Sequence, residues 1–332
     1  MINNKIVLGY IGNGKSTNRY HLPFVMQRPD KFIVKTIYNP RIHHDIWDKI
    51  EGVNYTENQD DIFLDDEIDM VVVCTGHHYH YEYTKNEQFL KVNLHMCEKA
   101  IEFLKRYVRD LFDESGIYHV SYDLWEMHEG THLYSLSAIF AAFESMVKIY
   151  KVLGKNVSDF ENNRLKDEKI NKNIDEISKL QVEIKKYIDE KLYDENRKSY
   201  IRNTNDKKMD ISLLGAVYPF KVFLPKEKKI LNTVDNINLT LRTYTGGYQR
   251  FEYDHYRDGA PWPIANLWMT LYYLESGEKK KAKETFDFVL KTAGKHSFLG
   301  EQVDNNTLKP NWVIGLGWSH AMFIIVLKKF MN

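Results

Sequence analysis

Two short acidic segments have residue types suited to hydrolysis of a glycosidic bond. The first is Asp123–Glu126 (DLWE), in which the glutamate follows a tryptophan, and the second is Gly300–Asp304 (GEQVD). Glycoside hydrolysis needs one carboxylic acid to protonate the leaving oxygen and a second carboxylate across the bond. We therefore take Glu126 as a candidate acid and Glu301 as its candidate partner.

The neighbours of these two glutamates suggest how each could be tuned. We expect Tyr122 and Trp125 to desolvate Glu126 and to raise its pKa, as a general acid requires. We also expect Gly300 to let the backbone approach a ligand closely. A glutamate beside a tryptophan is commonly a solvated surface residue, so that interpretation stays open.

A glycine-rich segment near residue 10 has residue types that suit phosphate binding. Gly9–Thr17 follows an apolar run, and glycines at such a turn leave backbone amides free to hold a pyrophosphate. Ribose recognition usually uses an acid after the second strand. Asn39 occupies that place, and the nearby Arg41 would tolerate a 2′-phosphate, which favours NADP slightly. A purely structural strand–helix turn is the alternative. The candidate loop residues are Gly12, Gly14, Lys15, Ser16 and Thr17.

The elements that would position these residues differ along the chain. In the first hundred residues, short apolar runs predict strands, and the segments between them have apolar residues at helical spacing. Alternating strands and helices favour a parallel sheet. After residue 100 the spacing predicts helices. We thus predict an α/β, Rossmann-like domain over residues 1–100 and an all-α domain over 101–332. The predicted strands are Lys5–Tyr10, Phe32–Tyr38, Ile68–Cys74 and Val92–Cys97; the predicted helices are Ile101–Phe112, Leu133–Leu153, Asp167–Leu192, Pro263–Leu274, Lys279–Thr292 and Trp318–Phe330.

Composition excludes several classes of protein. Lys+Arg and Asp+Glu both number 46 in 332 residues, which argues against a nucleic-acid or membrane-surface partner. Two cysteines cannot form a disulfide framework, and with no targeting signal they favour a cytoplasmic protein. Every apolar run is shorter than the ~20 residues that span a bilayer. His77, His78 and His80 lack a second group of ligands, so we predict no metal site.

The first hundred residues resemble the amino-terminal domain of the Gfo/Idh/MocA oxidoreductase family. The resemblance rests on Gly9–Pro23, on Val73–Tyr81, which is similar to the family's C-T-P-N-x-x-H segment, and on Cys97–Ala100, which is similar to its E-K-P motif. It implies NAD(P) binding, with Lys99 beside nicotinamide and substrate. Two prolines of these motifs are absent, and the family's second domain is not found. The further cofactor-binding residues that it implies are Thr75, His80 and Glu98.

Residues from about 101 to 330 resemble the glucoamylase family, glycoside hydrolase family fifteen. Tyr122–Ser137 resembles its catalytic-acid segment, Gly246–Leu267 the segment ending in G-N-P-W, and Gly300–Asp304 the segment of its base. The resemblance implies an inverting hydrolase of α-glucosidic bonds without a cofactor, with Glu126 as acid and Glu301 as base. Met127 and Ala260 depart from the family pattern. The implied substrate-binding residues are Tyr122, Asp123, Trp125, Arg250 and Trp262.

Both resemblances are partial. The early helices of the glucoamylase (α/α)6 barrel have no counterpart, so the sequence predicts an incomplete ring with apolar helix faces that could self-associate. Three interpretations follow: a hydrolase of oligo- or polysaccharide α-glucosides, an NAD(P)-dependent sugar oxidoreductase, or an inert fusion or binding protein.

Overall fold

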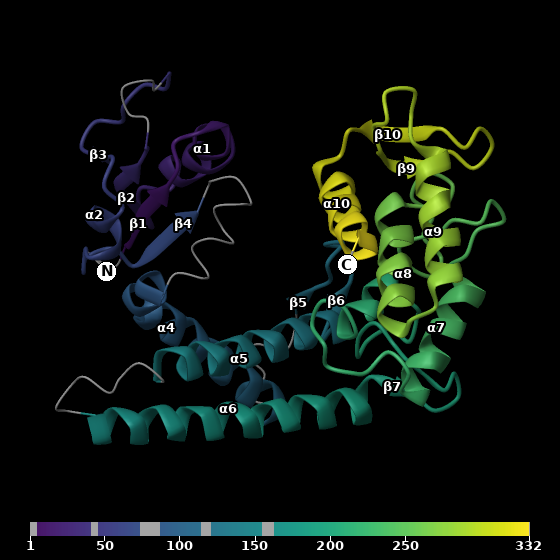
Figure 1. The fold of residues 1–332 in the computed structure, drawn as a ribbon, viewed down its shortest axis with the longest axis horizontal. Helices are drawn as coiled ribbons and strands as arrows, with labels where there is room; N and C mark the ends of the chain where they lie inside the picture. The colour runs from purple at the N-terminus through teal and green to yellow at the C-terminus, as the bar shows by residue number, and fades with distance from the viewer. Residues whose placement is uncertain (1–4, 41–45, 74–86, 114–120, 155–162, 332) are drawn as a thin grey trace. The chain divides into compact units, whose positions relative to one another are not determined.

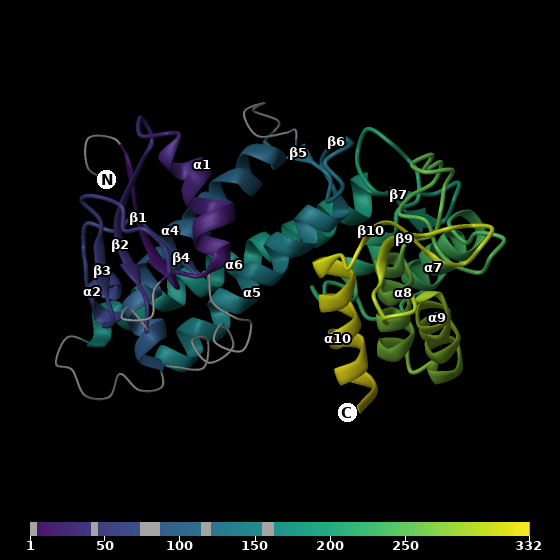
Figure 2. The ribbon, with the colours of Figure 1, turned by 90° about the horizontal axis from the view of Figure 1, so that it is seen from above.

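The computed structural model describes residues 5–40, 46–73, 87–113, 121–154 and 163–331 (Figures 1 and 2). The chain divides into two compact units. Unit 1 comprises Met1–Phe103 and Met146–Asn171, and unit 2 comprises Leu104–Ser145 and Lys172–Asn332.

A four-stranded parallel sheet forms the centre of unit 1. Its strands are β1 (Ile6–Ile11), β2 (Phe32–Tyr38), β3 (Asn54–Thr56) and β4 (Met70–Val73), in the order β3-β2-β1-β4. Three of these strands confirm the predicted apolar runs. β3 escaped prediction because three residues are too few to show an alternating pattern.

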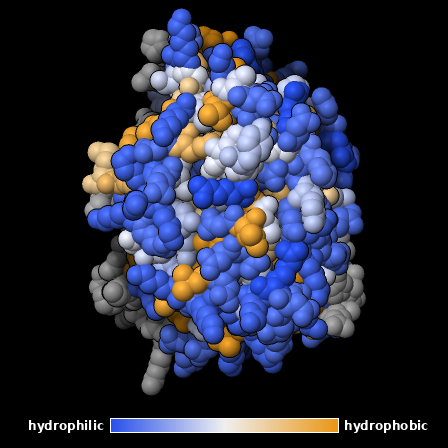
Figure 3. Space-filling view, turned by 90° about the vertical axis from the view of Figure 1, so that its right-hand side faces the viewer, coloured by the Kyte–Doolittle hydropathy of each residue, from blue (hydrophilic) through white to orange (hydrophobic). Residues whose placement is uncertain are grey.

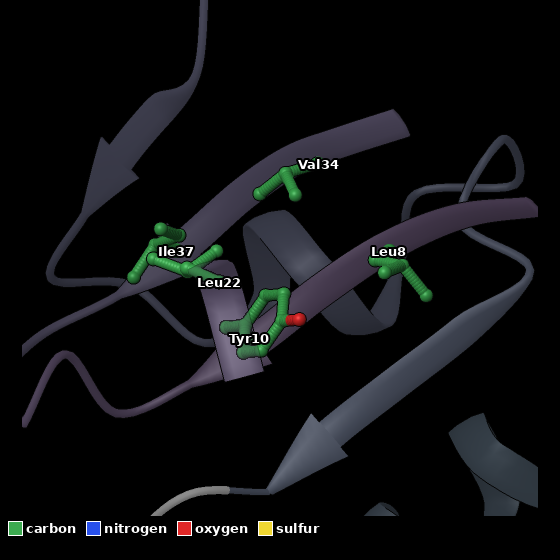
Figure 4. Close-up of a cluster of buried hydrophobic side chains, with 5 residues drawn as sticks. All are labelled: Leu8, Tyr10, Leu22, Val34 and Ile37. Atoms are coloured by element: carbon green, nitrogen blue, oxygen red, sulfur yellow. The ribbon is translucent and has the colours of Figure 1, made fainter. Parts of the chain in front are cut away.

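Short helices cover this sheet. A π-helical turn (η1, Ser16–His21) leads into α1 (Leu22–Met26), and α2 (Asp60–Phe63) precedes β4. Figure 4 shows the α1 side chain Leu22 among buried side chains of β1 and β2. A Cβ on Gly9 would lie 2.7 Å from Cγ2 of Ile62, so close packing of β1 needs a glycine there.

The predicted strand at Val92–Cys97 is wrong. This segment belongs to α4 (Glu87–Phe112), a single 26-residue helix. Its apolar residues continue at helical spacing into Ile101, Val108 and Leu111, which are buried, so a local apolar run was mistaken for a strand. Cys97 is consequently a half-buried free thiol within a helix, and burial raises its pKa.

Long helices follow as predicted. α5 (Leu133–Gly154) and α6 (Asn163–Lys191) confirm two amphipathic segments. Within unit 2, α8 (Pro263–Ser276) packs against α9 (Lys279–Thr292) and α10 (Gly317–Met331). α8 is buried on nearly every side, as expected of a helix that is apolar all round. α7 (Lys228–Thr240) was not predicted.

Three small antiparallel hairpins occupy parts of unit 2 where the sequence showed no strand signal. Apart from these hairpins, the structure confirms the predicted class. An α/β part is followed by a mainly helical part that forms a portion of a helical barrel. No helix in the described part of the chain is both long and apolar enough to cross a bilayer. The hairpins are β5 (Ser121–Tyr122) with β6 (Glu129–Gly130), β7 (Tyr193–Asp194) with β8 (Ser199–Tyr200), and β9 (Gly300–Val303) with β10 (Pro310–Ile314).

The face of the molecule in Figure 3 is mainly hydrophilic, with apolar side chains scattered over it. Several large apolar side chains of helix α10 are exposed, among them Ile324 (64% exposed) and Met331 (79% exposed). Exposed apolar side chains gathered on one helix commonly mark a surface that contacts another element or protein.

Candidate active site

Glu126 lies at the tip of the β5–β6 hairpin, in a turn organised by Asp123. The Asp123 carboxylate accepts hydrogen bonds from the backbone amides of Trp125 (3.1 Å) and Met127 (2.9 Å) and contacts Nδ1 of His128 at 2.7 Å. Burial alone would raise the pKa of Asp123, but these hydrogen bonds outweigh it and hold the pKa below its usual value. Asp123 therefore shapes the turn that carries Glu126, and its predicted contact with the sugar stays a prediction.

The turn holds Glu126 in an uncommon backbone conformation. Its φ is +58°, in the left-handed region that costs a non-glycine residue roughly 1–2 kcal/mol. The Glu126 side chain is exposed, so the prediction that aromatic neighbours desolvate it is wrong for this chain. Tyr122 is itself 57% exposed, and its hydroxyl donates to Glu129 at 2.7 Å. Eight other non-glycine residues of the described chain share a positive φ, so this conformation alone does not mark Glu126 as functional.

Trp125 lies on the buried side of the same turn, at the centre of an aromatic cluster. Its ring centroid is 5.5 Å from that of Trp318, 6.0 Å from that of Trp262 and 6.5 Å from that of Trp268. Its indole Nε1 donates to both carboxylate oxygens of Asp210, at 3.1 and 3.0 Å. The backbone that carries Glu126 is thus anchored to the interior of unit 2.

Arg250 joins this cluster from the segment before α8. Its guanidinium lies 4.4 Å from the Trp262 ring centroid and 5.5 Å from that of Trp125. It makes a two-pronged, buried ion pair with Asp254, at 2.8 and 2.9 Å. The stacked and paired guanidinium is a fixed positive charge among aromatic rings.

Glu301, on β9, faces the charge of Arg250. Burial raises the pKa of Glu301, and the charges of Arg250 and Arg257 only partly offset this. Its Oε2 is buried and has no hydrogen-bond partner among the described residues. The strand is tied to the segment before α8, because Val303 N donates to Pro261 O at 2.8 Å.

Gly300 has a different role from the one the sequence suggested. A Cβ there would lie 2.7 Å from the Gln302 carbonyl oxygen and 3.0 Å from that of Asn311. The close approach is therefore to the chain's own β9–β10 backbone rather than to a ligand.

Buried polar atoms around the cluster lack partners. Nε1 of Trp262, Nε1 of Trp268 and Oε2 of Glu301 find none among the residues that the structure describes. Buried polar groups are normally hydrogen-bonded, and leaving one unsatisfied costs about 1–3 kcal/mol. All three atoms are enclosed by the surrounding side chains, so a ligand contacts them only if those side chains move.

Comparison with known proteins identifies the family of the chain. The family model for glycosyl hydrolases family 15 matches residues 77–328, more than half of the sequence. The chain belongs to this family. A second model, for the oxidoreductase family with an NAD-binding Rossmann fold, matches residues 6–106.

Individual relatives of this family 15 chain cover only part of it. An uncharacterized glycosyl hydrolase of Methanocaldococcus jannaschii is 29% identical over 262 residues, which are 74% of this chain and 39% of that protein. A solved glycosidase variant has a TM-score of 0.53 at 17% identity, covering 65% of this chain and 57% of its own. A family 15 glucoamylase from Hypocrea jecorina has a TM-score of 0.50 at 13% sequence identity, and the match covers 64% of this chain and 44% of the glucoamylase. At these identities the structures show a shared fold alone.

The glycine-rich loop after β1 of this family 15 chain is the place of the predicted nucleotide site. Gly12 has a φ of +106°, and its amide donates to Tyr38 O, so it meets the end of β2, next to Asn39. Thr17 Oγ1 donates to Gly12 O at 2.5 Å. A Cβ on Gly14 would meet nothing within 4 Å, which leaves that side of the loop open. The loop fits a phosphate group.

Lys99 lies at the other edge of the sheet. It lines a cavity of about 320 Å³ with Asp69 and Met70, at the amino end of β4. Because β1 and β4 are parallel, the loop at Gly12 follows their carboxyl ends. The structure therefore does not bring Lys99 to that loop. The cause is α4, which carries the E-K-P-like segment as helix, with Glu98 accepting from Tyr150 Oη at 3.0 Å.

Other predicted positions cannot be compared in this way. Five of them lie outside the described residues: Arg41, Thr75, His77, His78 and His80. Lys15 is described, and its side chain is exposed. Of Ser16 the structure describes the backbone alone. Within the described ranges, no three His, Cys, Asp or Glu side chains gather so that they could hold a metal ion.

Sequence reasoning missed several residues of the cluster. Asp254 had a signal, because Arg250 and Asp254 are opposite charges four residues apart. Asp210 had only the Asp-x-Ser spacing of a helix cap, and its carboxylate does cap the 3-10 helix η3 (Ile211–Ala216). Nothing in the sequence indicated that Trp318, at the start of α10, would meet Trp125 in the β5–β6 turn, because the two lie far apart along the chain.

Proposed function

We propose that this chain hydrolyses α-glucosidic bonds of oligosaccharides with inversion at the anomeric carbon. The supporting observation is the aromatic cluster of Trp125, Trp262 and Arg250, next to which lie both the Glu126 turn and Glu301. Because the chain spans 39% of the length of the family relative compared above, the activity itself is our proposal.

The two carboxyl groups would have separate roles. Glu126 protonates the glycosidic oxygen as it leaves, and Glu301 removes a proton from the water that attacks the opposite face of the sugar. Inversion needs roughly 6.5–9.5 Å between the carboxyl groups, so that the water fits. The buried rings of Trp125, Trp262 and Trp268 support the site from within, whereas the exposed ring of Tyr122 can stack on a sugar face. Neither role needs a cofactor.

The first product anomer tests this proposal. We expect maltotriose to yield β-glucose first, observed by proton NMR before mutarotation equilibrates the anomers. If the 1,1-linkage is preferred, α,α-trehalose should yield β- and α-glucose in equal amounts, because the leaving glucose keeps its α configuration. Initial release of α-glucose from maltotriose, or of α-glucose alone from trehalose, would contradict the inverting mechanism. No glucose release from either substrate would favour the interpretation of the chain as an inert fusion or binding protein.

We propose further that the Gly12–Thr17 loop binds the pyrophosphate of NAD(H) or NADP(H). The open side of Gly14 and the family match over residues 6–106 support it. A bound dinucleotide would supply hydride chemistry. With Lys99 at the opposite edge of the sheet, no residue described at this loop matches the family's lysine, and we propose no hydride-transfer step.

Nucleotide binding can be tested by substitution at Gly14. We expect Gly14→Asp to weaken NADPH binding about fivefold or more, because unit charges 4 Å apart in water repel by about 1 kcal/mol. Gly14→Ala fills the same space without charge and should bind as the parent does. The enhancement of dihydronicotinamide fluorescence reports binding. Equal affinities of the two variants, or none in the parent, would refute the proposal.

Two further predictions complete the proposed function. The exposed apolar side chains of α10 are proposed to support self-association, and the absence of a disulfide framework favours a cytoplasmic protein.

A further inference from the structure

We infer that Asp210 is a positioning residue: it fixes the indole of Trp125 and thereby sets the orientation of the turn that carries Glu126. This inference rests on the proposed hydrolase function. Asp210 does not touch the reacting atoms in this scheme, and it acts through Trp125.

The geometry at Asp210 is closely constrained. Its side chain is buried, and Ser212 N donates to Oδ1 at 2.8 Å while Trp125 Nε1 reaches both oxygens. Its backbone bridges to Phe251, and Ile211 N donates to Arg250 O at 2.8 Å. Asp210 therefore joins the Glu126 turn to the segment that carries Arg250.

The turn is then fixed from two sides. On one side the Asp123 carboxylate holds the backbone amides of Trp125 and Met127; on the other, Asp210 holds the Trp125 indole. Glu126 lies between those amides at a strained φ of +58°. If the indole rotates, the restraint on the buried side of the turn is lost and the Glu126 carboxyl moves.

The charges around Asp210 make this anchor sensitive to pH. Burial raises the pKa of Asp210 to about 6. The hydrogen bonds from Ser212 and Trp125 and the charge of Arg202 lower this pKa, but they offset only part of the effect of burial. The guanidiniums of Arg202 and Arg250 and the His128 ring all pack on Phe251, which is bridged to Asp210. A charged acceptor holds an N–H more strongly than a neutral one, so protonation loosens the indole.

Fluorine NMR of the full chain labelled with 5-fluorotryptophan tests the inference without activity. The Trp125 signal is assigned by its loss in Trp125→Phe. We expect it to shift with pH with a midpoint near 6, and the shift to vanish in Asp210→Asn. Asp194→Asn removes another buried carboxylate of unit 2, one that holds the Arg197 amide, and should leave the shift intact. A flat Trp125 signal in the folded parent, or a titration that survives in Asp210→Asn, would overturn the inference.

Kinetics supply the second readout. Asp210→Asn is expected to lower kcat for maltotriose by up to about 100-fold, the cost of a displacement of about 1 Å, with a smaller change in KM. A change confined to KM would refute positioning of the acid. If Asp210→Asn fails to fold, the fluorine signal of Trp125 in the parent is the remaining test, and a signal that does not change through pH 6 overturns the inference. If the parent hydrolyses nothing, the proposed function fails and the NMR result still stands alone.

Discussion

Replacing Glu126 by glutamine is expected to slow hydrolysis of maltotriose by about 10²–10⁴-fold, the usual contribution of a general acid. Glutamine keeps the size of the side chain and cannot protonate the leaving oxygen. Glu129→Gln is the matched control, because Glu129 is an exposed glutamate of the same hairpin. Parental turnover by Glu126→Gln would refute the assignment.

A substrate that needs no protonation separates the two carboxyl groups. Fluoride leaves without strong acid help, so Glu126→Gln should retain most of its activity on α-glucosyl fluoride. Glu301→Gln should lose activity on both substrates, because the attacking water still needs a base. Initial rates of fluoride and glucose release measure the difference. Equal losses by both variants on both substrates would show that the roles are not divided in this way.

Removing the charge of Arg250 is expected to have the largest effect on stability. Arg250→Met leaves Asp254, which is 2% exposed, as an unpaired buried charge, and breaking such pairs costs about 3–5 kcal/mol. The double variant Arg250→Met/Asp254→Leu should recover much of this loss, because no charge is then left unpaired. Urea unfolding followed by tryptophan fluorescence measures the free energy of unfolding.

The control for this prediction is an exposed pair with the same sequence spacing. Lys283 and Asp287 on α9 are also four residues apart, but the lysine side chain is 70% exposed. Lys283→Met should change the free energy of unfolding by no more than about 1 kcal/mol. Equal losses for Arg250→Met and Lys283→Met would show that burial of the Arg250 pair is unimportant.

The sequence predicted elements well where the spacing of apolar residues was regular over several turns. Helix α9 has the predicted bounds, and its buried residues recur at helical spacing from Ala282 through Phe286 to Val289. The prediction failed at Val92–Cys97. This short segment alternates apolar and polar residues, and six residues are too few to distinguish a strand from one face of a helix. Only the continuation of the apolar face to Leu111 distinguishes them, and that lies beyond the predicted strand.

At the candidate site, the structure brings together three of the residues that the sequence singled out, but their surroundings differ from the prediction. Trp125, Trp262 and Arg250 lie together, and their roles at a sugar stay predictions. The environment of Glu126 was predicted from Tyr122 and Trp125 as neighbours in sequence, but Trp125 turns inward and leaves Glu126 exposed. Which side of a turn a residue faces depends on distant partners such as Asp210, and no local pattern contains them.

The bond between Trp125 and Asp210 joins positions 85 residues apart, which has a consequence for the order of folding. Helices α8 and α9 are neighbours in sequence, so they can pair early at little cost in loop-closure entropy. The contact between Trp125 and Asp210 must close a much longer loop. We therefore expect the helical core with Trp268 to form first and the Glu126 turn to dock on it late. Slow-folding or partly assembled molecules would then have ordered helices and no competent site.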